Sequence, residues 1–147
     1  MKILLINGPN LNLLGTREPD VYGSVTLGEI VGRVNERAGA LGAEVMAFQS
    51  NHEGAIIDFV QAESPAADGI VINPGALTHY GLSLRDALAA CRLPIIEVHI
   101  SNIYTRESFR RRSVTAEVSA GVISGLGWRG YLLALEAVVE LARDKKS

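Results

Sequence analysis

The chain has little of what marks proteins that bind nucleic acids, cross membranes or depend on disulfide bonds. Lysine and arginine number 14 against 16 acidic residues, and a net charge of -2 offers no electrostatic basis for a nucleic-acid partner. The opening apolar run, Ile3 to Ile6, is far too short to span a bilayer, and no secretory cleavage pattern accompanies it. We therefore expect no membrane attachment and a cytoplasmic location. The single Cys91 cannot form an internal disulfide, and its apolar neighbours indicate a small buried residue rather than a nucleophile.

Metal and phosphate motifs are also scarce. The three histidines, His52, His79 and His99, form no His-x-x-x-His pair and have no second cysteine beside them, so no metal site is predicted. Gly125 to Gly130 matches the dinucleotide fingerprint G-x-G-x-x-G, but the further strand and acidic residue that the fingerprint requires do not follow before Ser147. A tight turn into a last helix is the simpler interpretation. The alternative is a non-catalytic nucleotide-binding module, whose Tm would rise with NAD, FMN or ATP.

What the sequence does contain is a regular alternation of aliphatic runs and helical patterns within a length that fits one domain. Strands are predicted at 3–6, 43–48, 69–72, 95–98 and 121–124. Helices are predicted from Thr26 to Gly42, from Ser50 to just before Pro65, from Leu82 to Ala90 with Pro94 closing it, and from Tyr131 to Ala142. The first two begin with capping-box spacings, Thr26 with Glu29 and Ser50 with Glu53. This pattern predicts a single α/β domain, a flavodoxin-like three-layer sandwich with a five-stranded parallel sheet of order 2-1-3-4-5.

Polar residues follow three of the predicted strands. Asn7 and Asn10 follow the first strand, Asn73 and His79 the third, and residues 99–102 the fourth. In the predicted order these strands are neighbours, and their carboxyl ends meet at the topological switch point, where ligands bind in such sheets. The sequence therefore predicts a site at this edge of the sheet.

The long loop after the first strand has the composition of a lid. It carries Asn10, Arg17 and Tyr22 between glycines and prolines. An arginine against a tyrosine would lower the pKa of the phenol and make it a usable base. The alternative is a solvated loop in which Tyr22 merely packs and Arg17 pairs with Glu18.

Charged residues near the predicted site allow two interpretations each. Glu97 and His99 alternate along the fourth strand and face the same side, as a proton-transfer pair or as a structural pair. Arg106 and Arg110 share a face at helical spacing and would reach an anionic ligand, unless the whole run through Arg112 is a solvated face. Asp86 either binds a ligand hydroxyl or favours the positive end of its helix.

Several motifs in this order resemble type II 3-dehydroquinate dehydratase nearly from end to end. They are Gly8-Pro9-Asn10-Leu11-Asn12, Gly15-Thr16-Arg17-Glu18-Pro19, Val21-Tyr22-Gly23, Gln49 to Gly54, Asn73 to His79, Leu84 to Leu88, Glu97 to Asn102 and Gly130 to Leu135. The resemblance implies reversible anti elimination of water from 3-dehydroquinate, through an enolate, to give 3-dehydroshikimate. It also implies no metal, no cofactor and no Schiff-base lysine. The chain agrees on the last point, since Lys2, Lys145 and Lys146 are its only lysines.

The same resemblance assigns roles to individual residues. Tyr22 as phenolate removes the proton beside the ketone, Arg17 lowers the pKa of that phenol, and Asn10 stabilises the enolate, in part through a water. His99, oriented by Glu97, protonates the departing hydroxyl. The substrate, a small carboxylate, is held by Asn73, His79, Asp86, Ile100, Ser101, Arg106 and Arg110.

Assembly is also expected from the resemblance, as a homododecamer built as a tetramer of trimers. The chain departs from the commonest family pattern at three positions. Arg111 and Arg112 stand where histidine is expected at one or both, and Gly81 replaces a hydroxyl residue.

Overall fold

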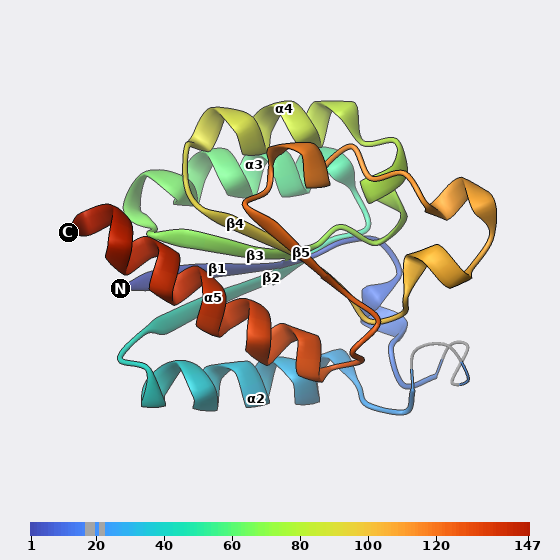
Figure 1. Cartoon of the computed structure of the whole chain (residues 1–147), viewed down its shortest axis with the longest axis horizontal. Coiled ribbons are helices and arrows are strands. Elements are labelled where there is room, and N and C mark those ends of the chain that lie inside the picture. Colours follow the sequence, from blue (N-terminus) through green and yellow to red (C-terminus); the bar gives the residue numbers. More distant parts are fainter. Residues whose placement is uncertain (17–19, 21–22) are drawn as a thin grey trace.

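A parallel five-stranded sheet lies at the centre of the protein, whose computed structural model describes residues 1–16, 20 and 23–147 (Figure 1). The strands are ordered β2-β1-β3-β4-β5, which confirms the predicted topology. Their bounds are β1 (Lys2–Asn7), β2 (Glu44–Gln49), β3 (Gly69–Asn73), β4 (Ile95–His99) and β5 (Gly121–Ser124).

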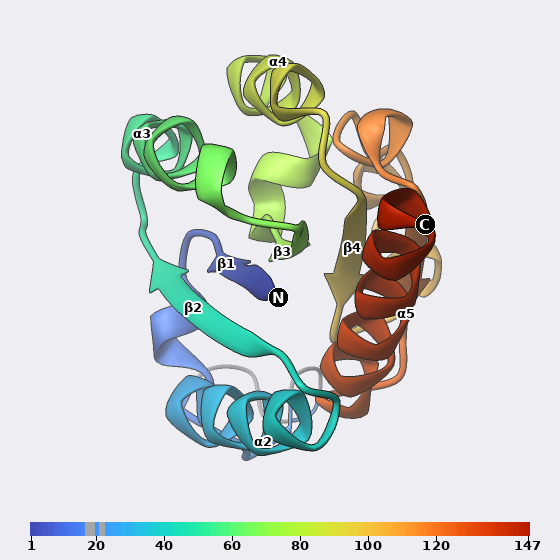
Figure 2. The same cartoon turned by 90° about the vertical axis from the view of Figure 1, so that its left-hand side faces the viewer.

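Helices cover both faces of this sheet. Figure 2 shows α2 (Leu27–Ala40) and α5 (Arg129–Lys146) on one face and α3 (Glu53–Glu63) and α4 (Leu82–Cys91) on the other. Short 3-10 turns are η1 (Leu11–Leu13), η2 (Ser64–Ala66), η3 (Gly75–His79), η4 (Ile103–Thr105), η5 (Ser108–Arg110) and η6 (Ala116–Val118). Across the described ranges, no helix has the length and apolar character needed to cross a membrane.

The alternation of side chains along the strands divides the core into two layers. In β1, Ile3 and Leu5 pack toward α2 and α5, whereas Leu4 and Ile6 pack toward α3 and α4, and all four are fully buried. A strand buried on both faces needs apolar residues at every position. This requirement explains the near-continuous aliphatic runs of β1, β3 and β4. These strands pair in parallel register, so their carboxyl ends lie side by side at one edge of the sheet.

The two predicted capping boxes have different outcomes. The Thr26 hydroxyl accepts the backbone N–H of Glu29 at 3.2 Å, so the first prediction is confirmed. The second is wrong, because α3 begins at Glu53 after His52, and the Ser50 hydroxyl instead accepts the backbone N–H of His52 at 3.0 Å. A serine that bonds two residues ahead forms a turn of its own and cannot also cap the helix.

The Glu53 carboxylate serves a different helix. Its Oε2 accepts the backbone N–H of Leu84 at 3.0 Å, one of the unpaired donors in the first turn of α4. A Cβ on Gly81, the residue that precedes α4, would lie 2.8 Å from the Leu77 carbonyl oxygen and 3.2 Å from Glu53 Oε2. Glycine at this position therefore leaves room for the cap, which gives a structural reason for one departure from the family pattern.

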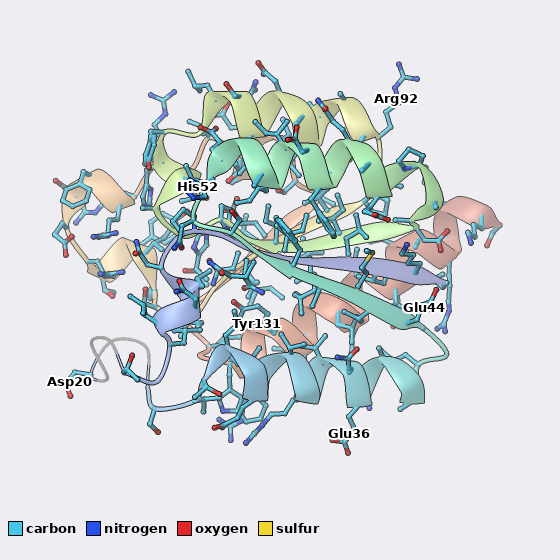
Figure 3. The ribbon with its side chains drawn as sticks, turned by 180° about the vertical axis from the view of Figure 1, so that it is seen from behind. Asp20, Glu36, Glu44, His52, Arg92 and Tyr131 are labelled. Atoms are coloured by element: carbon cyan, nitrogen blue, oxygen red, sulfur yellow. The ribbon has the colours of Figure 1, made fainter. Side chains whose placement is uncertain are left out.

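Removing this cap should lower stability. We expect Glu53→Ala to reduce the free energy of unfolding by about 1 kcal/mol, because the backbone N–H of Leu84 in the first turn of α4 loses a charged acceptor. Urea denaturation followed by circular dichroism measures the change. Glu36→Ala is the matched control, since Glu36 points into solvent from α2 (Figure 3) and should change stability by less than about 0.5 kcal/mol. Equal stability of the two variants would contradict the cap.

Two smaller expectations are modified by the structure. Cys91 is half-buried rather than buried, and its thiol donates to the Leu88 carbonyl at 3.0 Å. α4 ends at Cys91 because Arg92 adopts a left-handed conformation with φ of 56°, so Pro94 is not what ends it.

Candidate active site

The carboxyl ends of β1, β3 and β4 border a pocket with about 500 Å³ of empty space, including its open mouth. The loops that follow these strands gather at one end of the sheet in Figure 1. The lining residues are Pro9, Asn10, Leu11, Asn73, Gly75, Ala76, His79, His99, Ile100, Ser101, Ile103, Arg106 and Arg110. The structure thus brings together most of the site residues that the sequence predicted, from four separate segments.

Two loops cross at the base of this pocket, and each has a glycine where it meets the other. The Gly8 N–H donates to the Asn73 carbonyl at 2.8 Å, and a Cβ on Gly8 would lie 2.3 Å from the Pro74 carbonyl oxygen. Reciprocally, Gly75 has a φ of 60°, and its Cβ would lie 3.0 Å from the Pro9 carbonyl oxygen. These contacts between backbones explain the Gly-Pro and Pro-Gly pairs in the two loops.

Gly8→Ala should therefore disturb both the fold and the pocket. A methyl group against a backbone oxygen forces the loops apart, and we expect a loss of about 2 kcal/mol in unfolding free energy. Thermal unfolding provides the measurement. Gly54→Ala is the control, because a Cβ on this residue of α3 meets nothing within 4 Å, and alanine should stabilise the helix by up to about 1 kcal/mol. Similar stability of both variants would show that the loops do not touch in this way.

The amide of Asn73 is held in one orientation by a buried tyrosine. Its Nδ2 donates to the Tyr131 hydroxyl at 2.9 Å, and that hydroxyl donates to Asn7 Oδ1 at 2.7 Å. Asn73 Oδ1 accepts the Gly75 N–H at 3.1 Å. Burial raises the pKa of the Tyr131 phenol above its ordinary range, so it stays neutral and both donates and accepts. Tyr131 lies inside the molecule (Figure 3), and its two hydrogen bonds join α5 to the ends of β1 and β3.

Asn10 reaches the pocket through an unusual backbone conformation. Its φ of 71° lies in the left-handed region, and its backbone N–H donates to Asn51 Oδ1 at 2.9 Å. Gln49 Nε2 donates to the same Asn51 oxygen and to the Gly8 carbonyl. The last residue of β2 and the turn that follows it therefore fix the loop after β1, a role that sequence reasoning did not assign to Gln49 or Asn51.

His99 and Glu97 form a buried pair at the end of β4. The two atoms His99 Nε2 and Glu97 Oε2 lie 2.8 Å apart, and the Glu97 side chain is fully buried. Burial alone would raise the pKa of the Glu97 carboxyl, but hydrogen bonds from His99, Thr115 and Ser113 outweigh it and lower that pKa. An ionised carboxylate only accepts, so the His99 proton sits on Nε2, and Nδ1 is left for a ligand.

Cationic side chains line the outer wall of the pocket. Arg106 and Arg110 reach it, and Arg106 Nη1 lies 3.4 Å from the Ser101 hydroxyl. Arg110 pairs with Glu107 at 2.6 Å, which lowers the pKa of the Glu107 carboxyl. Arg111 and Arg112 are exposed. Arg106 and Arg110 both reach the pocket although the segment consists of two 3-10 turns and not of the helix that their spacing suggested.

Some predicted residues are not placed at this pocket. Asp86 is exposed, lies beyond the first turn of α4, pairs with Arg85 at 3.8 Å and does not line this pocket. The alternative role, a favourable charge at the positive end of α4, fails because Asp86 lies beyond the first turn of that helix. Arg17 and Tyr22 lie outside the described residues.

A metal site and a nucleotide site are the other two kinds of site on which the sequence motifs bear. No group of histidine, cysteine and acidic residues within the described part of the chain is arranged to hold a metal ion. The 125–130 segment forms the tight turn from β5 into α5, and a Cβ on Gly125 would lie 2.9 Å from Asn102 Cβ. Contact with the loop after β4 therefore accounts for this glycine.

Comparison with known proteins gives a consistent result. A family model described as "Dehydroquinase class II" matches residues 1–139. The chain is 68% identical to a 3-dehydroquinate dehydratase from Roseiflexus castenholzii over 92% of this chain and 87% of the relative, and 58% identical to one from Halothermothrix orenii over 97% and 96%. The crystal structure of a type II dehydroquinase from Butyrivibrio crossotus superposes with a TM-score of 0.92 at 51% identity, covering 94% of this chain and 97% of that one. On these grounds the chain belongs to the class II dehydroquinase family.

Proposed function

We propose that this protein is a hydro-lyase that converts 3-dehydroquinate reversibly to 3-dehydroshikimate by anti elimination through an enolate. The names of its relatives support the reaction. The observation that carries the proposal is a small polar pocket in which the His99–Glu97 pair faces the same space as Asn73, Arg106 and Arg110. An acid and a set of anion-binding groups are thus available at one place.

Substrate recognition in this proposal depends on the carboxylate. The Ser101 side chain and the backbone at Ile100 and Ser101 follow β4 directly, beside Asn73, whose amide orientation is fixed. His79 is held by the Arg112 carbonyl at 2.7 Å from its Nδ1, which leaves Nε2 for a substrate hydroxyl. Arg106 and Arg110 supply positive charge at the outer wall. Asp86 does not line the pocket of its own chain, so we assign it no contact with the substrate in a single chain.

The chemical step breaks a C–H bond and a C–O bond on opposite faces of the substrate ring. Tyr22, as phenolate beside Arg17, takes the proton next to the ketone, and Asn10, in part through a water, stabilises the enolate oxygen. The enolate then reforms the ketone and expels the hydroxyl, which takes a proton from His99 Nδ1 and leaves as water. Glu97 stabilises the imidazolium that donates this proton, and no cofactor or metal is needed.

A spectroscopic assay tests the reaction. The product has a carbon–carbon double bond conjugated with its ketone, so ultraviolet absorbance should rise when purified protein is mixed with 3-dehydroquinate. No rise in absorbance at high protein concentration would refute the proposal. Thermal shift separates it from nucleotide binding, because citrate or quinate should raise the Tm under this proposal, and NAD, FMN or ATP under the other.

Two further expectations belong to the same proposal. We propose a homododecamer built from trimers, on the family resemblance alone, and light scattering measures the mass directly. The same reaction serves aromatic biosynthesis and quinate breakdown. The genes that neighbour this one would distinguish the two roles.

A further inference from the structure

Two hydroxyl side chains, Ser113 and Thr115, contact the Glu97 carboxylate, and a third, Thr78, contacts both of them. The Ser113 hydroxyl lies 2.9 Å from Glu97 Oε2, and the Thr115 hydroxyl makes a short hydrogen bond to Oε1. Thr78 Oγ1 lies 2.8 Å from the Ser113 hydroxyl and 2.7 Å from that of Thr115. Thr78, Thr115 and Glu97 are fully buried and Ser113 is half-buried, so most of this polar network is shielded from solvent. We call the three hydroxyl residues, Thr78, Ser113 and Thr115, the hydroxyl cage.

The protons of the cage can be counted. Each hydroxyl has one proton, and an ionised carboxylate offers only acceptors. If Ser113 and Thr115 donate to Glu97, then Thr78 donates to one of them, and every proton is directed toward the carboxylate. The Ala116 N–H, 2.9 Å from the Ser113 oxygen, occupies an acceptor position on Ser113 and so favours this direction. Together with His99, Glu97 then accepts from three side chains.

The opposite arrangement is costly. A protonated Glu97 would need an acceptor for its own proton, and at least one of the surrounding donors would lose its partner in a buried place. The cage therefore favours a carboxylate that stays ionised and does not take the proton of His99. In that state the Nε2–H of His99 remains bound to Glu97, and proton exchange with a ligand is confined to Nδ1.

The cage also joins two segments that carry pocket residues. Thr78 precedes His79 in η3, and Ser113 follows the arginine segment. A backbone hydrogen bond from the Val114 N–H to the Thr78 carbonyl, 2.7 Å long, ties the segments together. The network that holds Glu97 is thus built from the same two pieces of chain that present His79 and Arg110 to the ligand.

We propose that Thr115, Ser113 and Thr78 are positioning residues for the reaction, which keep Glu97 an ionised acceptor and thereby restrict His99 to proton transfer through Nδ1. This inference rests on the proposed function for its catalytic meaning. Its physical content, the ionisation of Glu97, is measurable without any substrate.

Within the part of the chain that the structure describes, few other charges act on this carboxylate. His99 is the titratable group in direct contact with Glu97 among the described residues. His79 of η3 is held by a backbone carbonyl, and Arg85 of α4 pairs with Glu117 at 3.5 Å. A change in the titration of Glu97 after removal of a hydroxyl therefore reports on the cage itself.

The experiment compares Thr115→Val, which keeps the shape but removes the donor, with Thr115→Ser, which keeps the donor. Carboxyl carbon-13 NMR of the protein labelled at glutamate follows the titration of Glu97 in each. Because the hydrogen bonds lower the pKa of Glu97, protonation sets in only as the pH falls through that lowered value, and losing a donor moves the midpoint upward. We expect a rise of about one pH unit in Thr115→Val and a return to the wild-type midpoint in Thr115→Ser.

The acidic limb of the kcat profile should move by the same amount, with KM for 3-dehydroquinate nearly unchanged. Loss of activity or stability without any shift in the midpoint would mean a merely structural cage and would overturn the proposal. Ser113→Ala, which removes the donor to the other oxygen, gives the same test if Thr115→Val does not fold. If the wild-type protein lacks dehydratase activity but the midpoint shifts as expected, the proposed function fails while the ionisation claim stands.

Discussion

The His99→Asn enzyme should bind 3-dehydroquinate with nearly unchanged affinity and turn it over about 10³-fold more slowly. A positioned general acid contributes roughly 10²–10⁴-fold to rate, and here the departing hydroxyl would leave without a donor. The side-chain N–H of asparagine can take the place of the imidazole N–H beside Glu97, so this oxygen of the buried carboxylate keeps a donor. Steady-state kinetics across a pH range measures the loss, and the pH dependence assigned to the Glu97–His99 pair should disappear with it.

His52→Asn is the control for this variant. His52 is exposed at the start of α3 and does not line the pocket, so kcat should not change. A His99→Asn enzyme within tenfold of wild type would assign the acid to another residue.

The Tyr22→Phe enzyme should lose turnover by several orders of magnitude, roughly 10³-fold or more, because no base then removes the proton beside the ketone. Binding should survive, since the carboxylate contacts proposed for Asn73 and Ser101 do not involve the phenol. Isothermal titration with substrate and stopped-flow absorbance separate the two quantities. This prediction comes from the family resemblance, because Tyr22 is not among the described residues.

Tyr80→Phe provides the matched loss of a hydroxyl. Tyr80 is 63% exposed and does not line the pocket, so its variant should behave as wild type. If Tyr22→Phe turned over at the same rate as Tyr80→Phe, the base would have to be sought elsewhere.

The fold was predictable because the strands carry a strong local signal. The aliphatic runs of β1, β3 and β4 are buried on both faces, and this requirement leaves a near-continuous apolar pattern, interrupted within the runs only at Glu97 of β4. Once the strand order is known, the residues directly after these strands must lie together, as Asn73 and His99 do. Proximity of this kind follows from topology and needs no knowledge of side-chain contacts.

Contacts between distant segments were not predictable in the same way. The cage hydroxyls Thr115 and Ser113 have no periodicity or spacing that links them to Glu97, and serine and threonine in a polar stretch are ordinarily solvated. Glu53 was misassigned for a similar reason, because its spacing from Ser50 indicated a local cap while its actual partner is in α4. Asp86 lies at a matching motif position, but it pairs with Arg85 and does not line the pocket of its own chain.

A crystal structure of the protein with quinate bound would test the central claim most directly. We expect the carboxylate to contact Asn73 and Ser101, and the hydroxyl that corresponds to the leaving group to lie about 3 Å from His99 Nδ1. The Tyr22 hydroxyl should approach the opposite face of the ring. A ligand bound at the Gly125 turn, or one whose hydroxyls all lie beyond hydrogen-bonding distance of His99, would contradict the account.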